Sequence, residues 1–182
     1  MVGSAGRTDI DPVGAAAELV AATGAAVLPA LSVTRSLGVG REEWTRFARD
    51  PLLHKVIRLL SRIAAALDEV GEWNVQVHPF RIRSAPRECG AGGQPTPEGR
   101  HRDGVTLVSS LLVARRNAIG GESAVYEADG RRLLTATLAE PGTLLVSDDR
   151  RTLHQVSPIR PLEGDGPARR DVLVITFASG RP

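Results

Sequence analysis

The sequence predicts a mainly β fold, an antiparallel sandwich or barrel of the jelly-roll type that follows an N-terminal helical layer. Three observations predict this fold class. Apolar residues recur at helical spacing up to about residue 70, and from Glu72 onward they alternate with a period of two. Several short apolar segments with turn residues between them complete the chain. Because these strands follow the helices and do not alternate with them, an antiparallel arrangement is favoured over a parallel sheet.

The length of 182 residues suits one compact domain with a substantial core. We therefore expect a single domain over residues 1–182. Residues 1–71 are expected to form its helical layer with one strand. Residues 72–182 are expected to form a jelly-roll core that carries the functional site.

The N-terminal layer is predicted to contain three helical segments and one strand. Residues 12–23 indicate a short amphipathic helix, and residues 25–31 indicate a strand. A second helical block begins near Arg41. The longest helix is predicted over residues 51–70, where six apolar residues fall at helical spacing and a proline occupies the first position. His54 is expected on the surface of this helix and not in a metal site.

The rest of the chain is predicted to form strands. Residues 73–82 show two faces, with Val75 on one face and His78 on the other, and residues 84–100 form a polar loop with three prolines and four glycines. Asp129-Gly130 and Pro141-Gly142 mark tight turns. Further strands are predicted within the apolar segments 105–115, 122–127, 131–138, 142–147, 152–159 and 171–178, with an exposed loop over 162–168.

Composition argues against several classes of protein. The formal net charge is +2 and aromatic residues make up 3%, so neither a phosphate-binding patch nor a base-stacking surface for nucleic acid is indicated. No apolar run reaches the length of a membrane span, and the first residues lack the pattern of a signal peptide. Cys89 is the single cysteine, which rules out an internal disulfide. We expect a cytoplasmic protein.

His101-Arg102-Asp103 is the most informative motif. Side chains at positions i and i+2 of an extended segment point to the same side, so His101 and Asp103 can bind one ion together. His154, from a distant strand, would complete a triad of two histidines and one carboxylate. Such a triad leaves one face of an octahedral metal open and suits Fe(II) and its oxygen chemistry. Chance supplies an H-x-D motif in about one such chain of five, so the motif alone is weak support. Its position directly before an apolar run strengthens the prediction, because a metal site at the edge of a strand requires that position.

Four blocks of sequence resemble one known family. They are residues 97–104, 117–122, 153–158 and 170–177, and they look like the corresponding blocks of bacterial 2-oxoglutarate/Fe(II) dioxygenases related to isoleucine 4-hydroxylase. The resemblance covers about residues 72–178. It implies a double-stranded β-helix core, ferrous iron, 2-oxoglutarate as co-substrate and O₂. It also implies hydroxylation of a free amino acid or a small amino-acid-derived metabolite, with release of succinate and CO₂.

The resemblance assigns roles to individual residues. His101, Asp103 and His154 match the metal ligands of the family. Arg170 matches the cation that binds the far carboxylate of 2-oxoglutarate, a task for which a guanidinium is well suited. Arg169 is the rival candidate, because neighbouring residues on a strand face opposite ways.

Further candidates are weighed against structural roles. The segment from His78 to Arg81 resembles a strand that precedes the metal motif in the relatives, so His78 or Arg81 is expected either to contact substrate or to make structural hydrogen bonds. Glu122 either meets a substrate amine or faces solvent. The polar cluster over residues 147–151 is expected to be a solvated turn without a chemical role. Paired glycines at 120–121 indicate a bend or a close backbone approach.

Other reactions and functions stay open. An aspartate at position 103 argues against halogenation, because related halogenases carry a small residue there. Desaturation, ring formation and epoxidation use the same oxidant as hydroxylation. The same three ligands also suit a jelly-roll isomerase or hydrolase with Zn²⁺, Ni²⁺ or Mn²⁺, which Arg170 disfavours. A non-catalytic binding module is disfavoured by the intact ligand set.

Overall fold

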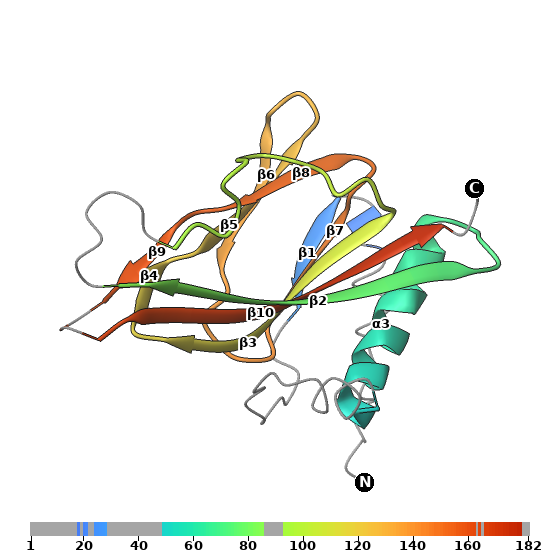
Figure 1. Cartoon of the computed structure of the whole chain (residues 1–182). Helices are drawn as coiled ribbons and strands as arrows, with labels where there is room; N and C mark the ends of the chain where they lie inside the picture. The colour runs from blue at the N-terminus through green and yellow to red at the C-terminus, as the bar shows by residue number, and fades with distance from the viewer. Residues whose placement is uncertain are drawn as a thin grey trace, which may run out of the picture.

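The computed structural model describes residues 18, 20, 21, 24–28, 49–85, 93–162, 164 and 166–179 (Figure 1). It confirms a mainly β fold with one described helix of several turns. The elements are β1 (Ala25–Leu28), α3 (Pro51–Leu67), β2 (Trp73–Ser84), β3 (Leu107–Arg116), β4 (Ala118–Gly120), β5 (Glu122–Glu127), β6 (Arg132–Thr137), β7 (Leu144–Asp148), β8 (Thr152–Val156), β9 (Ile159–Pro161) and β10 (Ala168–Ser179).

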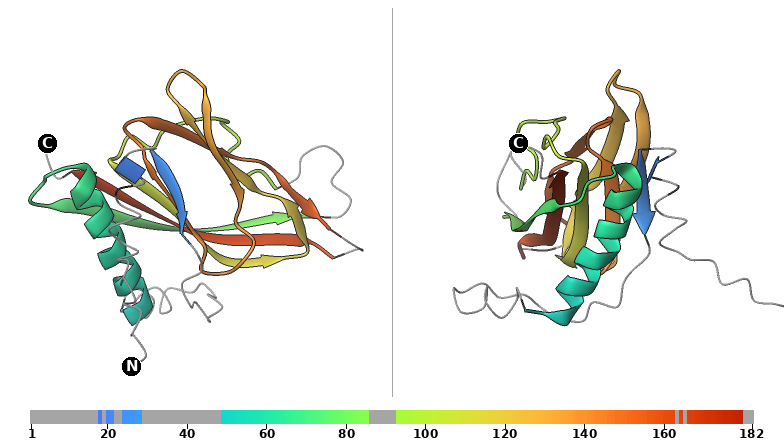
Figure 2. Two further views of the ribbon diagram at one scale, coloured as in Figure 1. Left: turned by 180° about the vertical axis from the view of Figure 1, so that it is seen from behind. Right: turned by 90° about the vertical axis from the view of Figure 1, so that its right-hand side faces the viewer.

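The strands form the two main sheets of a jelly roll, and the strand pairings among the described residues are antiparallel. Five strands form the larger sheet in the order β1-β7-β3-β10-β2, and three form a second sheet in the order β6-β5-β8. Strands β4 and β9 make a separate two-stranded ribbon. Figure 2 shows the long strands β2, β3 and β10 running side by side beneath the smaller sheet. The sandwich predicted from the order of elements is therefore confirmed.

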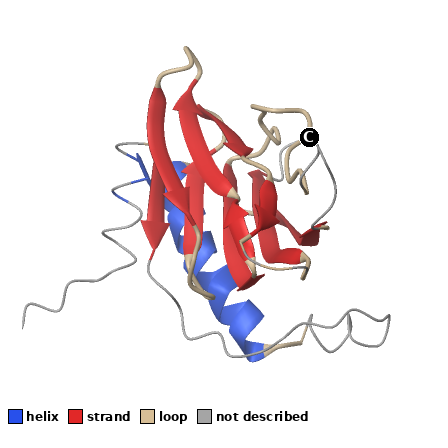
Figure 3. Cartoon of the chain, turned by 90° about the vertical axis from the view of Figure 1, so that its left-hand side faces the viewer, coloured by secondary structure: helices blue, strands red, loops and turns tan. Residues whose placement is uncertain are grey.

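Helix α3 covers the outer face of the larger sheet (Figure 3). It begins at Pro51 after the N-cap residue Asp50, whose side chain accepts a hydrogen bond of 2.8 Å from the backbone N–H of Leu52. Its apolar face packs on the sheet, and each fully buried large side chain contributes about 1.5–3 kcal/mol. The buried residues of the helix are Leu53, Val56, Leu60, Ile63 and Ala64. His54 lies on the exposed face, as predicted.

Strand β10 separates two apolar layers because its side chains alternate between the faces of the sheet. Leu173, Ile175 and Phe177 join the core beneath α3. Val172 joins a second core that lies between the two sheets. Residues of even number in β10 therefore face the interior of the sandwich, and this parity decides which polar side chains reach the interior.

The tight turns lie where the sequence predicts them. Asp129-Gly130 joins β5 to β6, and Gly130 adopts a φ of 91°. At Pro141-Gly142 the carbonyl of Glu140 accepts a hydrogen bond of 3.1 Å from the N–H of Thr143. Gly142 has a φ of 90°, as the third residue of a type II turn requires.

Several boundaries differ from the sequence expectation. Helix α3 ends at Leu67, because Asp68 has extended backbone angles. Strand β10 begins at Ala168, which was predicted to lie in an exposed loop and is fully buried. The short strands β4 and β9 were not predicted, because three residues are too few to show a periodic pattern.

The N-terminal expectations are tested only in part. Residues 18, 20 and 21 are helical, which agrees with the helix predicted over 12–23, but its remaining residues lie outside the described part of the chain. The helical block expected from Arg41 also lies outside it, up to residue 48. Strand β1 occupies the predicted place and pairs with β7. Within the described residues, no helix combines the length and apolar character that crossing a bilayer would require.

The carboxylate of Asp171 joins β2 to β10 on the outer face of the larger sheet. It accepts hydrogen bonds from Arg81 at 3.0 and 3.1 Å, and it also pairs with Arg169. Burial by itself raises the pKa of Asp171, but the hydrogen bonds from the two guanidinium groups outweigh it and lower the pKa below its usual range.

Asp171→Asn is expected to lower the free energy of unfolding at pH 7 by about 1.5–3 kcal/mol, the usual contribution of hydrogen bonds to a charged group. Because the folded-state pKa is lowered, this contribution is present above the unfolded-state pKa of about 3.9 and is lost as the pH falls through the folded value. Urea unfolding at pH 7 and in acid measures both effects. Glu140→Gln, at an exposed acid, is the control and should leave stability within about 0.5 kcal/mol. Equal midpoints for the two variants would contradict the prediction.

Candidate metal centre

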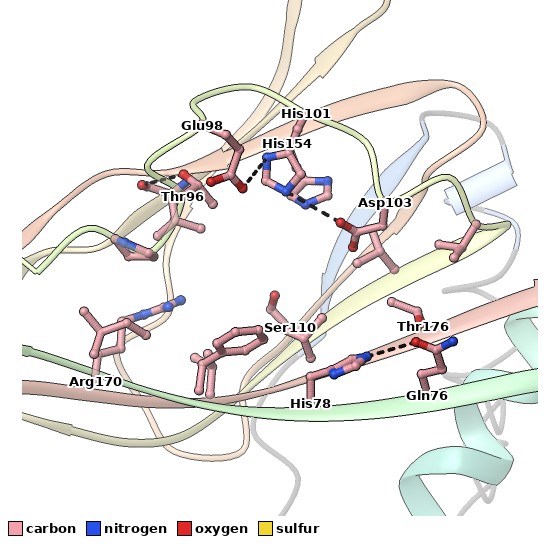
Figure 4. Close-up of a pocket in the computed structure, with 18 residues that line it drawn as sticks. Gln76, His78, Thr96, Glu98, His101, Asp103, Ser110, His154, Arg170 and Thr176 are labelled. Carbon is pink, nitrogen blue, oxygen red and sulfur yellow. Dashed lines mark hydrogen bonds and ion pairs between the residues drawn. The ribbon is translucent and has the colours of Figure 1, made fainter.

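The three predicted ligands come together in the structure. His101 and Asp103 lie on the segment that precedes β3, and His154 lies in β8. One ligand atom from each residue lies within 4.8 Å of the others. His101 Nε2 is 3.6 Å from the Asp103 carboxylate, and the two imidazole rings have centroids 4.3 Å apart (Figure 4). This spacing suits three ligands that converge on one ion.

A backbone pairing places the two histidines side by side. The N–H of His101 donates to the carbonyl of His154 at 3.1 Å, and the N–H of His154 donates to the carbonyl of His101 at 3.0 Å. These bonds form an isolated antiparallel bridge. On its other side, His154 pairs with Val125 of β5. The loop ligand is therefore held by the same strand that carries the second histidine.

The Nδ1 atom of each histidine faces a carboxylate. His101 Nδ1 lies 3.0 Å from the carbonyl oxygen of Gly99 and 3.2 Å from Glu98. His154 Nδ1 lies 3.6 Å from the carboxylate of Asp149. Partners of this kind orient metal-binding histidines in proteins, because they leave the Nε2 lone pair free for the ion.

Asp149 contacts the triad and its loop, which the sequence reasoning missed. Ser147, Asp148 and Asp149 are all buried, so the prediction of a solvated turn is wrong for these three residues. Burial raises the pKa of Asp149, but the nearby His154 imidazole, 3.6 Å away, and hydrogen bonds from backbone N–H groups such as that of Val105 outweigh it and hold the pKa below its usual range. The one available signal was its place directly after an apolar strand.

A cavity of about 510 Å³ connects the triad with Arg170. Its size lies within the range of small-molecule sites. Figure 4 shows Arg170 at one end of the cavity, with Asp103, Gln76 and Thr176 toward the other end. Apolar side chains from β2, β3 and β10 form much of the wall between these ends, including Phe80, Ile82, Val108, Val172 and Val174.

Arg170 is almost completely buried and points into the cavity. Its side chain is 1% exposed, and its Nε and Nη2 atoms have no hydrogen-bond partner among the described residues. Burial, together with the nearby charge of Arg115, lowers the pKa of Arg170 to about 10. Arg169 points to the outer face, where it pairs with Asp171. The geometry therefore favours Arg170 over Arg169 as the cation of the cavity.

A β-bulge brings a second arginine beside Arg170. Strand β3 pairs Leu112 with Val172 and Ala114 with Asp171, so Val113 is an extra residue. The shift places Arg115 directly opposite Arg170 on the same face of the sheet. Two like charges in this position repel each other unless an anion lies between them.

Gly121 provides the space for these two side chains. It has a φ of 66°, and a Cβ atom on it would lie 3.1 Å from the Arg115 guanidinium and 3.2 Å from Arg170 Cδ. A Cβ on Gly120 would lie 2.1 Å from the carbonyl oxygen of Pro158. The paired glycines therefore supply the close approach that the sequence indicated.

The remaining candidates lie in different places. His78 lines the cavity, and its Nε2 atom lies 3.1 Å from the side-chain oxygen of Gln76. Arg81 lies three residues further along β2, so it faces the opposite side and contacts Asp171. Glu122 is exposed and does not line the cavity. Besides Asp103, Glu98 is the acidic side chain that lines the cavity in the described part of the chain.

A family model described as 2OG-Fe dioxygenase matches residues 42–176. Among curated proteins, the 3(1)-hydroxy-L-isoleucine 4-dioxygenase of Pantoea ananatis (strain AJ13355) is 29% identical over 130 residues. The matched region covers 69% of this chain and 49% of that protein. The chain thus spans about half the length of the curated relative it matches.

Solved structures show the same fold. A bsmA homolog from Methylobium petroleophilum PM1 superposes with a TM-score of 0.66 and 36% identity, covering 78% of this chain and 54% of that chain. IDO from Bacillus thuringiensis superposes with a TM-score of 0.64 and 22% identity, covering 75% of this chain and 60% of that chain. The fold is thus shared with proteins of known structure.

His101→Ala and His154→Ala are each expected to weaken binding of Co(II), a spectroscopic substitute for Fe(II), by more than about 100-fold. Each change removes one of three ligands, and loss of a residue that only supports a ligand already costs about 10–100-fold. Visible absorption during a Co(II) titration measures the affinity. His78→Ala, at a histidine of the same cavity, is the matched control and should keep wild-type affinity. Wild-type affinity in His101→Ala would overturn the assignment of the ligands.

Proposed function

Because the chain belongs to the 2OG-Fe dioxygenase family, we propose that it is a non-haem iron enzyme that uses 2-oxoglutarate and O₂ to hydroxylate a small metabolite. The proposed substrate class is a free amino acid or a small amino-acid-derived compound. One observation carries the proposal. A converging His-Asp-His triad and an unpaired, buried arginine lie at separate places in the wall of a single cavity.

The triad fits ferrous iron. Two neutral imidazoles and one carboxylate leave part of the coordination sphere open, and this donor set suits Fe(II). His101, Asp103 and His154 would hold the ion. When bound, iron supplies the activation of O₂ that couples decarboxylation of 2-oxoglutarate to oxidation of the substrate. The carboxylate of Asp103 favours hydroxylation over halogenation, because halogenases related to this family carry a small residue at that position.

The arginine end fits the far carboxylate of 2-oxoglutarate. The unpartnered Nε and Nη2 atoms of Arg170 lie on one edge of the guanidinium, so they can donate two parallel hydrogen bonds to a carboxylate. Arg115 adds a second positive charge on the same face. A buried cation without a partner is costly, and an anion in the cavity removes this cost. This demand for an anion supports an oxygenase over a metal-dependent hydrolase or isomerase.

The other end of the cavity supports a small substrate with both polar and apolar parts. His78, Gln76 and Thr176 present polar groups there, near Asp103 (Figure 4). Val105, Val108 and Val174 add apolar surface. The curated relative from Pantoea ananatis acts, by its name, on a hydroxylated isoleucine. An aliphatic amino acid or a derivative of one therefore agrees with the walls of the cavity and with the similarity.

Protein purified without oxygen and then supplied with Fe(II), 2-oxoglutarate and air is expected to release succinate, and the correct substrate should accelerate the release. A screen of free amino acids and of their peptide-bound and carrier-bound forms identifies that substrate. Succinate is measured by chromatography with mass detection. His101→Ala and Asp103→Ala should abolish its formation, because each removes a proposed iron ligand. Unchanged succinate formation in these variants would refute the proposed site.

Arg170→Ala is expected to weaken 2-oxoglutarate binding by about 2–5 kcal/mol, the usual effect of removing one partner of a buried charge pair. Calorimetry on the anaerobic metal-loaded protein measures the affinity. Arg169→Ala is the matched control, because Arg169 is the adjacent arginine and faces away from the cavity. Loss of affinity in Arg169→Ala with wild-type affinity in Arg170→Ala would show that Arg169, and not Arg170, binds 2-oxoglutarate.

A further inference from the structure

Asp149 contacts both parts of the chain that carry the triad. It directly follows β7 and is completely buried. One carboxylate oxygen, Oδ2, accepts hydrogen bonds from the backbone N–H groups of Gly104 at 2.8 Å and Val105 at 3.1 Å. The other oxygen, Oδ1, faces His154 Nδ1 at 3.6 Å. A single carboxylate thus lies between the loop of Asp103 and the strand of His154.

The contact with the loop controls the position of Asp103. Gly104 adopts a φ of 76°, a conformation that turns the chain sharply after Asp103. The N–H of Gly104 and the N–H of the next residue both point at Asp149. In return, the N–H of Asp149 donates to the carbonyl of Thr106 at 3.1 Å. Asp149 therefore binds the backbone at the turn after the triad carboxylate and over the two residues that follow it.

His154 Nδ1 and Asp149 Oδ1 are both buried without a hydrogen-bond partner among the described residues, and they face each other at 3.6 Å. A small approach of the two side chains would join them and fix the proton of the imidazole. A neutral histidine carries one ring N–H, and its hydrogen-bond partner decides which nitrogen carries it. A buried carboxylate can only accept, so it favours the tautomer with the proton on Nδ1. That tautomer leaves the lone pair on Nε2, the nitrogen with which a histidine in this orientation binds a metal.

We propose that Asp149 is the positioning residue of the metal centre, which fixes the tautomer of His154 and the turn after Asp103 at the same time. This inference rests on the proposed function, because it gives a role to a neighbour of the proposed ligands. Asp149 would not itself contact the ion. The exposed Glu98, which faces His101, is less confined, since its side chain is 50% exposed whereas that of Asp149 is fully buried.

The neighbouring Asp148 offers a matched control. It is also buried, at 1% exposure, and also carries a carboxylate at the end of β7. Its side chain pairs with Arg150 and makes no hydrogen bond or ion pair with the three triad residues. Asp148→Asn therefore removes a buried negative charge one residue away and leaves the contacts of the ligands intact.

The first test uses the wild-type protein without metal. Nitrogen NMR at a pH of about 8.5, above the usual imidazole pKa, distinguishes the protonated from the unprotonated ring nitrogen. The chain has four histidines, so the spectrum of His154→Ala assigns the signals of His154. We expect the proton on Nδ1. A proton on Nε2 would overturn the proposal, and this result does not depend on whether the protein turns over 2-oxoglutarate.

The second test compares Asp149→Asn with Asp148→Asn. In Asp149→Asn, the amide can present its NH₂ group to His154 or to the loop, so we expect a shift of His154 toward the Nε2 tautomer. We also expect Co(II) affinity to fall by about 10–100-fold, the usual effect of removing such a partner. Asp148→Asn should keep the wild-type tautomer and affinity.

Different results would refute the role of Asp149 and the proposed oxygenase function. Equal loss of Co(II) affinity in both variants would indicate general loosening of the site and would overturn the proposal. An unchanged tautomer and affinity in Asp149→Asn would overturn it as well. Absence of succinate from the wild-type protein would refute the proposed function, whereas the tautomer of metal-free His154 would still test the role of Asp149.

Discussion

The two backbone hydrogen bonds between His101 and His154 are the contact on which the candidate site depends. They join a loop to β8, a strand that is itself paired with β5. Side chains on such a directly paired position lie close together and on the same face. The imidazoles therefore converge because the backbone is paired, before any ion is bound. The same bridge also determines the position of the Asp103 side chain, because Asp103 lies two residues beyond His101 and points to the same side.

A second constraint comes from buried positive charge. Arg170 and Arg115 lie opposite each other across β10 and β3, and some of their donor groups have no partner among the described residues. Burial of unpaired charge opposes folding, and close like charges oppose it further. The bulge at Val113 and the absence of a Cβ at Gly121 make this arrangement sterically feasible. The fold thus tolerates an unfavourable pair at a place where an anionic ligand would stabilise it.

Local patterns were readable in the sequence, and long-range contacts were not. The two faces of β2 and the shared side of His101 and Asp103 follow from strand geometry alone. The same rule places His78 and Arg81 on opposite faces, since an odd number of residues separates them. The bonds from Gly104 to Asp149 join residues 45 positions apart, so no local pattern reveals them. The bulge that turns Arg115 inward depends on the register of its partner strand.

Two points in the wall of the cavity are held rigidly by the sheets. His154 is held by β8, and Arg170 lies in β10, which is hydrogen-bonded to β3 on one side and to β2 on the other. Neither point can slide along its strand without breaking a ladder of backbone bonds. In the proposed site, the distance from the triad to the guanidinium is therefore fixed, and it sets the length of the co-substrate that can bind both. A diacid shorter or longer than 2-oxoglutarate would reach either the triad or the Arg170 guanidinium but not both. The two sheets would therefore select the co-substrate by its length.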